Sequence, residues 1–168
     1  LWVYYGLPPA LGIRLDALAS RAEVARGTLY NYFPSKDALL GAILEPVLEQ
    51  ALRGVKPLRR RKARAAVQGM VDLYLALWRD HEHALCIAFG PQGRLVEQVE
   101  ELHVRYVREV MALFERAARA GVLRTDDARA SAMTFRLTVV PVLGTFAALP
   151  EAEQRARETL CAMLLRPE

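Results

Sequence analysis

Three histidines and two cysteines are the side chains in this 168-residue sequence best suited to binding a transition metal. His81, Glu82, His83 and Cys86 stand close together, and His103 is a possible fourth ligand. Side chains two positions apart on a helix point away from one another, so His81 and His83 could share a metal only at a helix end or in a loop. Histidines beside a ligand cavity, or in plain packing, are the preferred interpretation. We therefore expect neither a metal nor another cofactor.

Arg136 is the only charged residue between Arg129 and Glu151. It stands three residues after Met133 and four before Val140, on an apolar helix face, so the pattern predicts a buried arginine. A buried arginine needs a partner. The partner could be an acidic residue of this chain, one of a second subunit, or an acidic ligand.

Enzymatic chemistry is not indicated, because no nucleophile, base and orienting residue fall into a recognisable arrangement and no glycine-rich loop could hold a phosphate. The cysteines, Cys86 and Cys161, lie on separate expected helices, which favours a reducing cytoplasm over a disulfide framework. The longest uncharged run, residues 137–150, is too short to span a bilayer. No secretory signal is recognisable.

The segment 24–40, VARGTLYNYFPSKDALL, is typical of a helix-turn-helix because it holds a short helix, a helix stop and a new helix start. Leu29 and Phe33 stand four residues apart and share the inward face of the short helix. Pro34 ends that helix, and Ser35 can cap the next one. The residues left on the other faces are Arg26, Thr28, Tyr30, Asn31 and Tyr32.

Two stretches carry a family resemblance. Residues 27–33 (GTLYNYF) with residues 34–40 (PSKDALL) resemble the recognition helix and following cap of the TetR family of bacterial transcriptional regulators. Residues 15–19 (LDALA) resemble the family's supporting helix. The resemblance covers residues 1–45, and beyond them only the helical layout and length are similar.

The resemblance implies a set of contacts with double-stranded operator DNA, in which Arg26 and Gly27 face base edges and Lys36 faces a phosphate. The residues placed on DNA are Arg14, Arg26, Gly27, Thr28, Tyr30, Asn31, Tyr32 and Lys36.

Two positions depart from the family. Arg14 stands where a capping Ser or Thr is usual, and Glu23 replaces the glycine of the tight turn. Since a non-glycine residue holds a left-handed conformation only at some cost, a slightly different turn is expected. Of the family's first helix only the last turn is expected. Either a segment precedes the numbered chain, or the domain is short of one wall.

Aromatic and sulfur-containing side chains recur on several expected helices, and in a helical protein such residues belong to the core by default. In the TetR family the same region encloses a cavity for a small effector, so the resemblance implies that some of them line it. The expected effector-binding residues are Met70, Tyr74, Trp78, Phe89, His103, Tyr106, Met133, Phe135 and Arg136.

The periodicity predicts an all-α chain without strands, in which a helix-turn-helix domain (residues 1–45) precedes a six-helix body (residues 46–168). The resemblance implies that this body is the effector-binding and dimerisation domain. Pro46 should kink the helix that starts at Lys36 or mark where the domain joins the body. Gly121 and the segment 125–127 should end and start helices. The expected bounds of the body helices are 36–53, 62–80, 81–89, 94–120, 125–149 and 151–165.

The net charge of +4 and the isoelectric point near 9.3 suit a polyanionic partner. The basic run 59–64 could contact phosphates, although an exposed connector is the preferred interpretation. The last two helices hold more apolar surface than one small body can cover, and a homodimer through them is expected, with Leu160 in the interface.

Two hypotheses follow. The first is a dimeric regulator whose DNA affinity is lowered by a small, mostly apolar effector; a repressor is expected, and the sequence leaves an activator open. The second is a helical small-molecule-binding or scaffold protein that has lost DNA binding.

Overall fold

The computed structural model describes residues 15–89 and 96–167, without the side chain of Phe89. Within these ranges all regular secondary structure is helical, apart from one isolated antiparallel bridge between Leu123 and Leu165. None of the helices in these ranges is long and apolar enough to cross a membrane. The prediction of an all-α fold is confirmed. The helices, with one 3-10 helix (η2), are α1 (Leu15–Arg21), α2 (Arg26–Tyr32), α3 (Lys36–Val55), η2 (Lys56–Arg60), α4 (Ala63–Phe89), α5 (Glu97–Arg119), α6 (Ala128–Phe146) and α7 (Ala152–Leu164).

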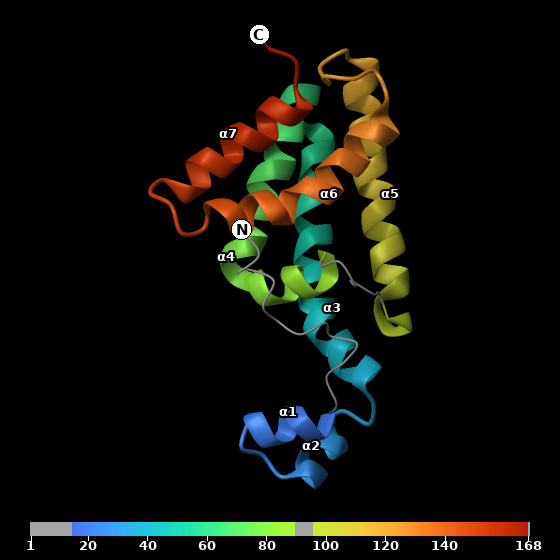
Figure 1. The fold of residues 1–168 in the computed structure, drawn as a ribbon. Helices are drawn as coiled ribbons and strands as arrows, with labels where there is room; N and C mark the ends of the chain where they lie inside the picture. Colours follow the sequence, from blue (N-terminus) through green and yellow to red (C-terminus); the bar gives the residue numbers. More distant parts are fainter. Residues whose placement is uncertain (1–14, 90–95, 168) are drawn as a thin grey trace.

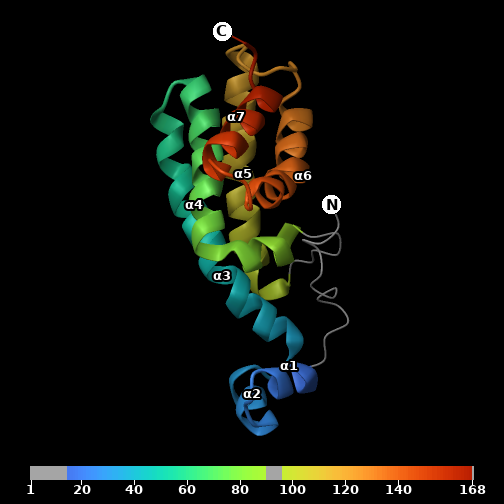
Figure 2. The same cartoon turned by 60° about the vertical axis from the view of Figure 1, so that its left-hand side comes forward.

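Helix α3 is the axis of the molecule (Figure 1). Its first turns leave the α1–α2 unit, and its later turns run into the body, where α4 and α5 pack against it and α6 and α7 complete the bundle. Figure 2 shows from a second direction that α1 and α2 lie at one end of the molecule, apart from the other helices. Neither α1 nor α2 contributes a residue to the two apolar clusters that hold the body together.

Most of the body is built on one large core. Phe114 on α5 is fully buried at 0% exposure, and it packs at 6.1 Å, ring centre to ring centre, from Phe135 on α6. A smaller cluster joins Leu44 of α3 to Val96 and Val99 at the start of α5. This second cluster lies toward the α1–α2 end of α3, so the axis helix is packed along most of its length.

The start of α3 follows from its sequence. Phe33 is extended (φ −132°, ψ 91°) before Pro34, and the Ser35 hydroxyl then accepts a hydrogen bond from the Ala38 amide at 3.0 Å. This N-cap confirms the predicted helix start. Pro46 lies inside α3 on an exposed face, and the helix continues through it to Val55.

Helix α4 contains the boundary that the sequence placed between two helices. His81 has non-helical angles (φ −143°, ψ 34°), and because the chain is helical on either side of it, α4 is one helix with a kink at that residue. Gln50 of α3 holds the kink: its amide nitrogen donates to Asp80 Oδ2 at 2.7 Å, and its amide oxygen lies 2.7 Å from His81 Nε2. The kink turns the end of α4 toward α5. Counted on both sides of the kink, the described body has the six helical segments that the sequence predicted.

The predicted caps between α5 and α6 are also present. Gly121 adopts φ +65°, a conformation that costs other residues more than glycine, directly after α5 ends. Asp127 is the N-cap of α6, and its carboxylate accepts hydrogen bonds from the amides of Arg129 at 2.8 Å and Ala130 at 2.9 Å. These local signals bring α6 back across α5.

Candidate functional site: an exposed helix pair and a pocket joined by one helix

The turn between α1 and α2 is tight and left-handed. Glu23 has φ +55°, and the Val24 amide donates to the Ala19 carbonyl at 3.0 Å. Glu23 therefore takes the conformation that favours glycine, although the sequence predicted a slightly different turn at this position. Ala19 is fully buried at 0% exposure beneath this turn.

Helix α2 presents nearly all of its side chains to solvent. None of its residues is buried; Leu29 is half-buried, and Tyr32 is 76% exposed. No atom lies within 4 Å of where a Cβ on Gly27 would stand, so a partner could approach the backbone there. The residues expected on DNA that are exposed in this helix are Arg26, Gly27, Thr28, Tyr30, Asn31 and Tyr32. Lys36 is half-buried at the start of α3, and Arg14 lies outside the described residues.

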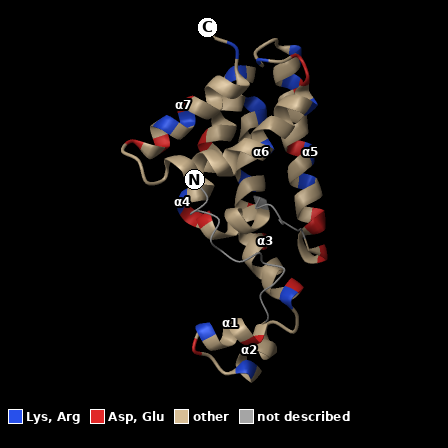
Figure 3. Ribbon diagram, in the orientation of Figure 1, with Lys and Arg blue, Asp and Glu red and all other residues tan. Residues whose placement is uncertain are grey.

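Asp16 on α1 is a feature that the sequence analysis did not anticipate. Its Oδ1 atom lies 3.8 Å from Arg26 Nε and accepts a hydrogen bond from the Tyr30 hydroxyl at 3.4 Å. The Arg26 side chain is 69% exposed, so this ion pair is worth little and is easily exchanged for another anion. Figure 3 shows charges of both signs on the α1–α2 unit and the start of α3. Residues 15–37 balance to zero, with Arg21, Arg26 and Lys36 against Asp16, Glu23 and Asp37.

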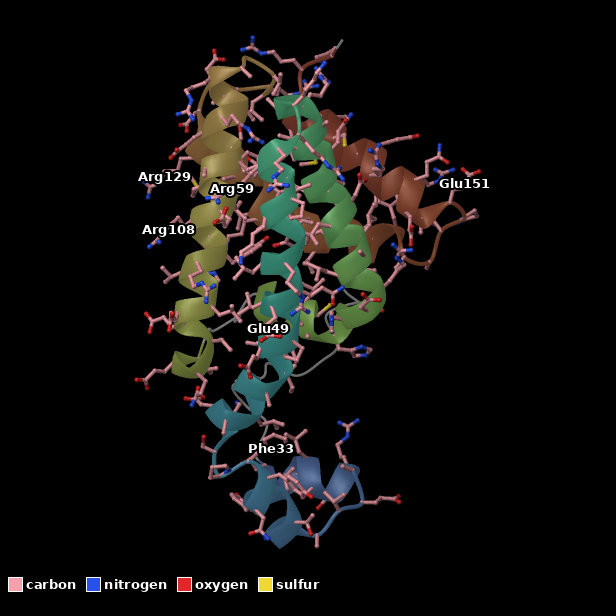
Figure 4. The ribbon with its side chains drawn as sticks, turned by 180° about the vertical axis from the view of Figure 1, so that it is seen from behind. Phe33, Glu49, Arg59, Arg108, Arg129 and Glu151 are labelled. Carbon is pink, nitrogen blue, oxygen red and sulfur yellow. The ribbon has the colours of Figure 1, made fainter. Side chains whose placement is uncertain are left out.

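The basic run 59–64 belongs to the body. Arg59 Nε forms an ion pair with Glu109 Oε2 at 2.7 Å, and Arg64 donates to the Arg166 carbonyl at 2.7 Å. Figure 4 places Arg59 in the upper half of the molecule and Phe33 at the opposite end. This run lies far from α2 and acts as a connector tied to α5.

A pocket of about 380 Å³ lies inside the body, enclosed by α3, α4, α5 and α6. This volume is near the lower end of the range of small-molecule sites, roughly 300–1,000 Å³. Apolar side chains form most of its wall. The lining residues are Leu44, Val47, Leu48, Ala51, Met70, Tyr74, Leu77, Leu85, Ala88, His103, Tyr106, Val107, Val110, Met111, Arg129, Ala132, Met133, Phe135 and Arg136.

Most of the residues expected to bind an effector line this pocket: Met70, Tyr74, His103, Tyr106, Met133, Phe135 and Arg136. Trp78 is half-buried and packs against the core, and it is not among the lining residues. The side chain of Phe89 lies outside the described part. The sequence analysis missed the aliphatic wall, including Leu44, Leu48 and Leu77, because leucine at helical spacing has the same pattern in any core.

Two tyrosines give the pocket a buried polar pair. The Tyr106 hydroxyl donates to the Tyr74 hydroxyl at 3.0 Å, and Phe135 packs edge-on against Tyr74 with ring centres 5.0 Å apart. Burial raises the pKa of Tyr74 to about 12, and burial also raises the pKa of Tyr106 well above its usual range. Both hydroxyls therefore stay protonated at neutral pH and act as hydrogen-bonding groups without charge.

Arg136 differs from its prediction. It is exposed rather than buried, and its Nη1 atom lies 4.0 Å from Met133 Sδ. It forms no ion pair with the residues that the structure describes. Its charge nevertheless reaches the pocket: burial and then Arg136 lower the pKa of His103, so His103 is neutral at pH 7. Arg136 is exposed because α6 places it at the rim of the pocket, where the guanidinium can reach water.

Residues 12–43 match the sequence profile of the bacterial regulatory proteins of the tetR family, and these residues include α1, α2 and the first turns of α3. The helix-turn-helix end of the chain is therefore similar to that of the TetR family.

Two curated transcriptional regulators are similar to part of the chain. The HTH-type transcriptional regulator RutR of Escherichia coli K12 is 38% identical over 74 residues, which is 44% of this chain and 35% of RutR. The regulator EthR of Mycobacterium tuberculosis H37Rv is 40% identical over 55 residues, which is 33% of this chain and 26% of EthR. The matched segments thus span about a third of the relatives' length.

Two solved structures share the fold of this chain over nearly all of its length. PfmR from Thermus thermophilus aligns with a TM-score of 0.67 at 18% identity, covering 92% of this chain and 89% of PfmR. The probable transcriptional regulatory protein RHA5900 aligns with a TM-score of 0.70 at 18% identity, covering 94% of this chain and 91% of that one. The body therefore has the fold of these proteins.

The last two helices, α6 and α7, divide their apolar residues between core and surface. Leu160 is fully buried at 0% exposure, so its predicted place in a subunit interface is wrong: it packs inside its own subunit. The exposed apolar residues of this region are Met133, Leu137, Leu149 and Met163. Helical periodicity could not separate the two sets, since both helices carry apolar residues on more than one face.

No cluster of three or more metal-ligating side chains is formed by the described residues. His81 is engaged with Gln50 at the α4 kink, and His103 is in the pocket wall. The histidines singled out in the sequence therefore lie in different places in this fold.

Proposed function

We propose that this protein is a dimeric transcriptional repressor of the TetR family that binds operator DNA through α2 and is released when a small, mostly apolar effector fills the pocket. One observation carries the proposal. Helix α3 starts directly after α2, and the same helix supplies Leu44, Val47, Leu48 and Ala51 to the pocket wall. A molecule in the pocket therefore touches the element that positions the DNA-reading helix.

The proposed DNA contacts follow from exposure and family resemblance. Arg26 and Gly27 face base edges, Arg26 as a bidentate donor to guanine and Gly27 as a point of close approach. Tyr30 and Asn31 lie beside them. The proposed phosphate contacts are Arg14, Thr28, Tyr32 and Lys36. Binding of Arg26 to DNA replaces its exposed contact with Asp16, which costs little.

The proposed switch is a tilt of α3. Two recognition helices of a dimer must match successive major grooves, about 34 Å or a multiple apart. A ligand wedged between α3 and the helices that carry Tyr74, Tyr106 and Phe135 moves the far end of α3 and spoils one half-site. The domain boundary at residues 45 and 46 falls within this helix, so the two proposed domains share one rigid element.

The proposed dimer forms through α6 and α7. Leu137 is 62% exposed on α6, Met133 is 45% exposed one turn earlier, and Met163 is 36% exposed on α7. Large apolar side chains gathered on one surface favour a subunit contact. The proposed place of action is the cytoplasm, because bacterial DNA lies there.

A second function has one observation in its favour: the zero net charge of residues 15–37 supplies little general attraction to DNA. In that case the chain is a small-molecule-binding protein without DNA binding. Titration of the protein with short duplex DNA at several salt concentrations separates the two. The regulator's affinity falls steeply with salt, since phosphate contacts release counterions. Absence of any salt-dependent binding would overturn the regulator.

A further inference from the structure

The charged groups around the pocket have one sign. Its described lining includes Arg129 and Arg136, and it includes no aspartate or glutamate. Neither arginine is paired with an acidic residue within residues 15–89 and 96–167. Figure 4 shows Arg129 and Arg108 on the same side of α5, with side chains that project outward. The charged side chains of the described lining, both of them on α6, are therefore positive.

Arg136 is the arginine whose charge reaches inward. It lowers the pKa of His103 and opposes part of the rise that burial causes in the pKa of Tyr74. These two side chains come from different helices, α5 and α4. The guanidinium of Arg136 thus lies near a polar end of the pocket, where neutral His103 and the tyrosine pair offer hydrogen bonds without adding charge.

The part of the lining that α3 and the later turns of α4 supply is apolar. It includes Leu44 and Leu48 of α3 and Leu77, Leu85 and Ala88 of α4. A ligand that fits both parts of the lining has a hydrocarbon part and an anionic part at one end, because Arg136 at the rim attracts a negative charge and has no acidic partner among the described residues. A cation at the same place would meet the positive rim.

We propose that the pocket selects an amphipathic carboxylic acid, with its carboxylate on Arg136, a second hydrogen bond from His103, and its hydrocarbon part against α3 and α4. The proposal rests on the proposed function, because it names the chemical class of the effector for the same pocket. The volume of about 380 Å³ limits the acid to a compact chain or ring system. The hydrocarbon part of the acid touches α3. The carboxylate therefore selects the ligand, and the hydrocarbon part moves the helix.

The test compares three probes with the same ten-carbon chain: decanoate, decanol and decylamine. Isothermal titration calorimetry on the whole chain at pH 7 and without DNA measures each affinity. We expect decanoate to bind at least about tenfold more tightly than decanol, since a charge-assisted hydrogen bond is roughly twice as strong as a neutral one. Decylamine should bind most weakly.

Three variants locate the preference. Arg136→Met keeps the length and apolar stem of the side chain, and it should reduce the preference for decanoate over decanol to less than about threefold. Arg136→Lys should keep part of it, because a lysine is a point charge without the planar fork. Arg108→Met is the matched control: it removes one positive charge from an exposed position of α5 outside the pocket lining, and it should leave the preference unchanged.

The outcomes separate this inference from the proposed function. Equal or tighter binding of decanol to the unaltered protein, or an undiminished preference in Arg136→Met, would overturn the acid and leave an apolar effector in place. If none of the three probes binds, both the acid and the mostly apolar effector are overturned. Equal losses in Arg136→Met and Arg108→Met would mean that general surface charge, and not Arg136, attracts the acid.

Discussion

The two ends of α3 differ in what holds them. At one end, α1 and α2 have few buried side chains, balanced charges and no share in the apolar clusters of the body. At the other end, α4 to α7 enclose a large core and a pocket. The α1–α2 pair therefore exposes its side chains to a partner, whereas the body surrounds one. Substitutions should therefore affect stability in the body and binding at the helix pair.

The largest effect is expected from Phe114→Ala in the body. Phe114 is fully buried at 0% exposure, and truncation of a buried phenylalanine typically costs about 3–5 kcal/mol. Urea unfolding followed by circular dichroism should show a lower midpoint. Leu29→Ala in the half-buried face of α2 is the contrasting variant and should change that midpoint much less. Similar losses for both variants would contradict the division between the two ends.

Next in size is Leu137→Arg on α6. Leu137 is 62% exposed in one subunit, so the change should leave the fold intact. In a two-fold dimer the substitution acts twice, and loss of a central apolar contact costs about 2 kcal/mol or more for each copy. Sedimentation should then show monomers at micromolar concentration.

The control for the dimer is Val104→Arg on α5, a position that is 48% exposed and outside the last two helices. It should sediment like the unaltered protein. A monomeric unaltered protein at the same concentration would rule out the proposed dimer.

Arg26→Ala tests the exposed end. The loss of one bidentate base contact should reduce discrimination at one base pair by about 1–3 kcal/mol, while unfolding stays unchanged. Lys36→Ala should instead weaken binding to all sequences alike, because a phosphate contact carries no sequence information. Binding to operator variants, measured at one fixed salt concentration, distinguishes the two. Uniform losses for both variants would show that Arg26 does not read bases.

Ser35→Ala probes the joint between the two ends. The Ser35 hydroxyl accepts from the Ala38 amide at 3.0 Å, and removal of such an N-cap typically costs about 1 kcal/mol. Amide hydrogen exchange should increase in the first turn of α3 and stay the same near Val55. Ser35→Asp, which restores an acceptor, should reverse the change. Faster exchange throughout α3, including near Val55, would show that loss of the cap opens the whole helix and would contradict the confinement of the effect to its first turn.

The smallest effect concerns pH and the pocket. Burial lowers the pKa of His103 below its ordinary value of 6.5, so the unfolded chain takes up this proton before the folded protein does. This contribution to stability is fully present above pH 6.5 and is lost as the pH falls through the lower folded pKa. His103→Gln should remove that part of the pH dependence in thermal unfolding between about pH 7 and about pH 5, a range that starts just above a histidine's usual value and extends below it. The exposed His83→Gln should not.

Short-range signals account for what could be predicted. The N-caps at Ser35 and Asp127 and the left-handed Gly121 depend on a few neighbouring residues, and all three lie where the sequence indicated. The exposure of the α2 residues expected on DNA also follows from a local pattern, since α2 is a short helix with one inward face. Their contact with DNA stays a prediction. Most of the expected pocket residues line the pocket. They could be named from the sequence because aromatic and polar side chains differ from the aliphatic residues around them.

The sequence by itself determined where the helices lie, where they end and which side chains of α2 are exposed. Each of these depends on hydrogen bonds and steric contacts within one or two turns of chain. Only the tertiary structure decided that Arg136 is exposed at a rim, that Leu160 is buried in its own subunit, and that Asp16 faces Arg26. The physical reason is that burial and charge pairing depend on which residues, distant in the chain, occupy the space beside a side chain. An apolar helix face indicates that something covers it. The packing of the neighbouring helices decides whether that is the core, a ligand or a second subunit.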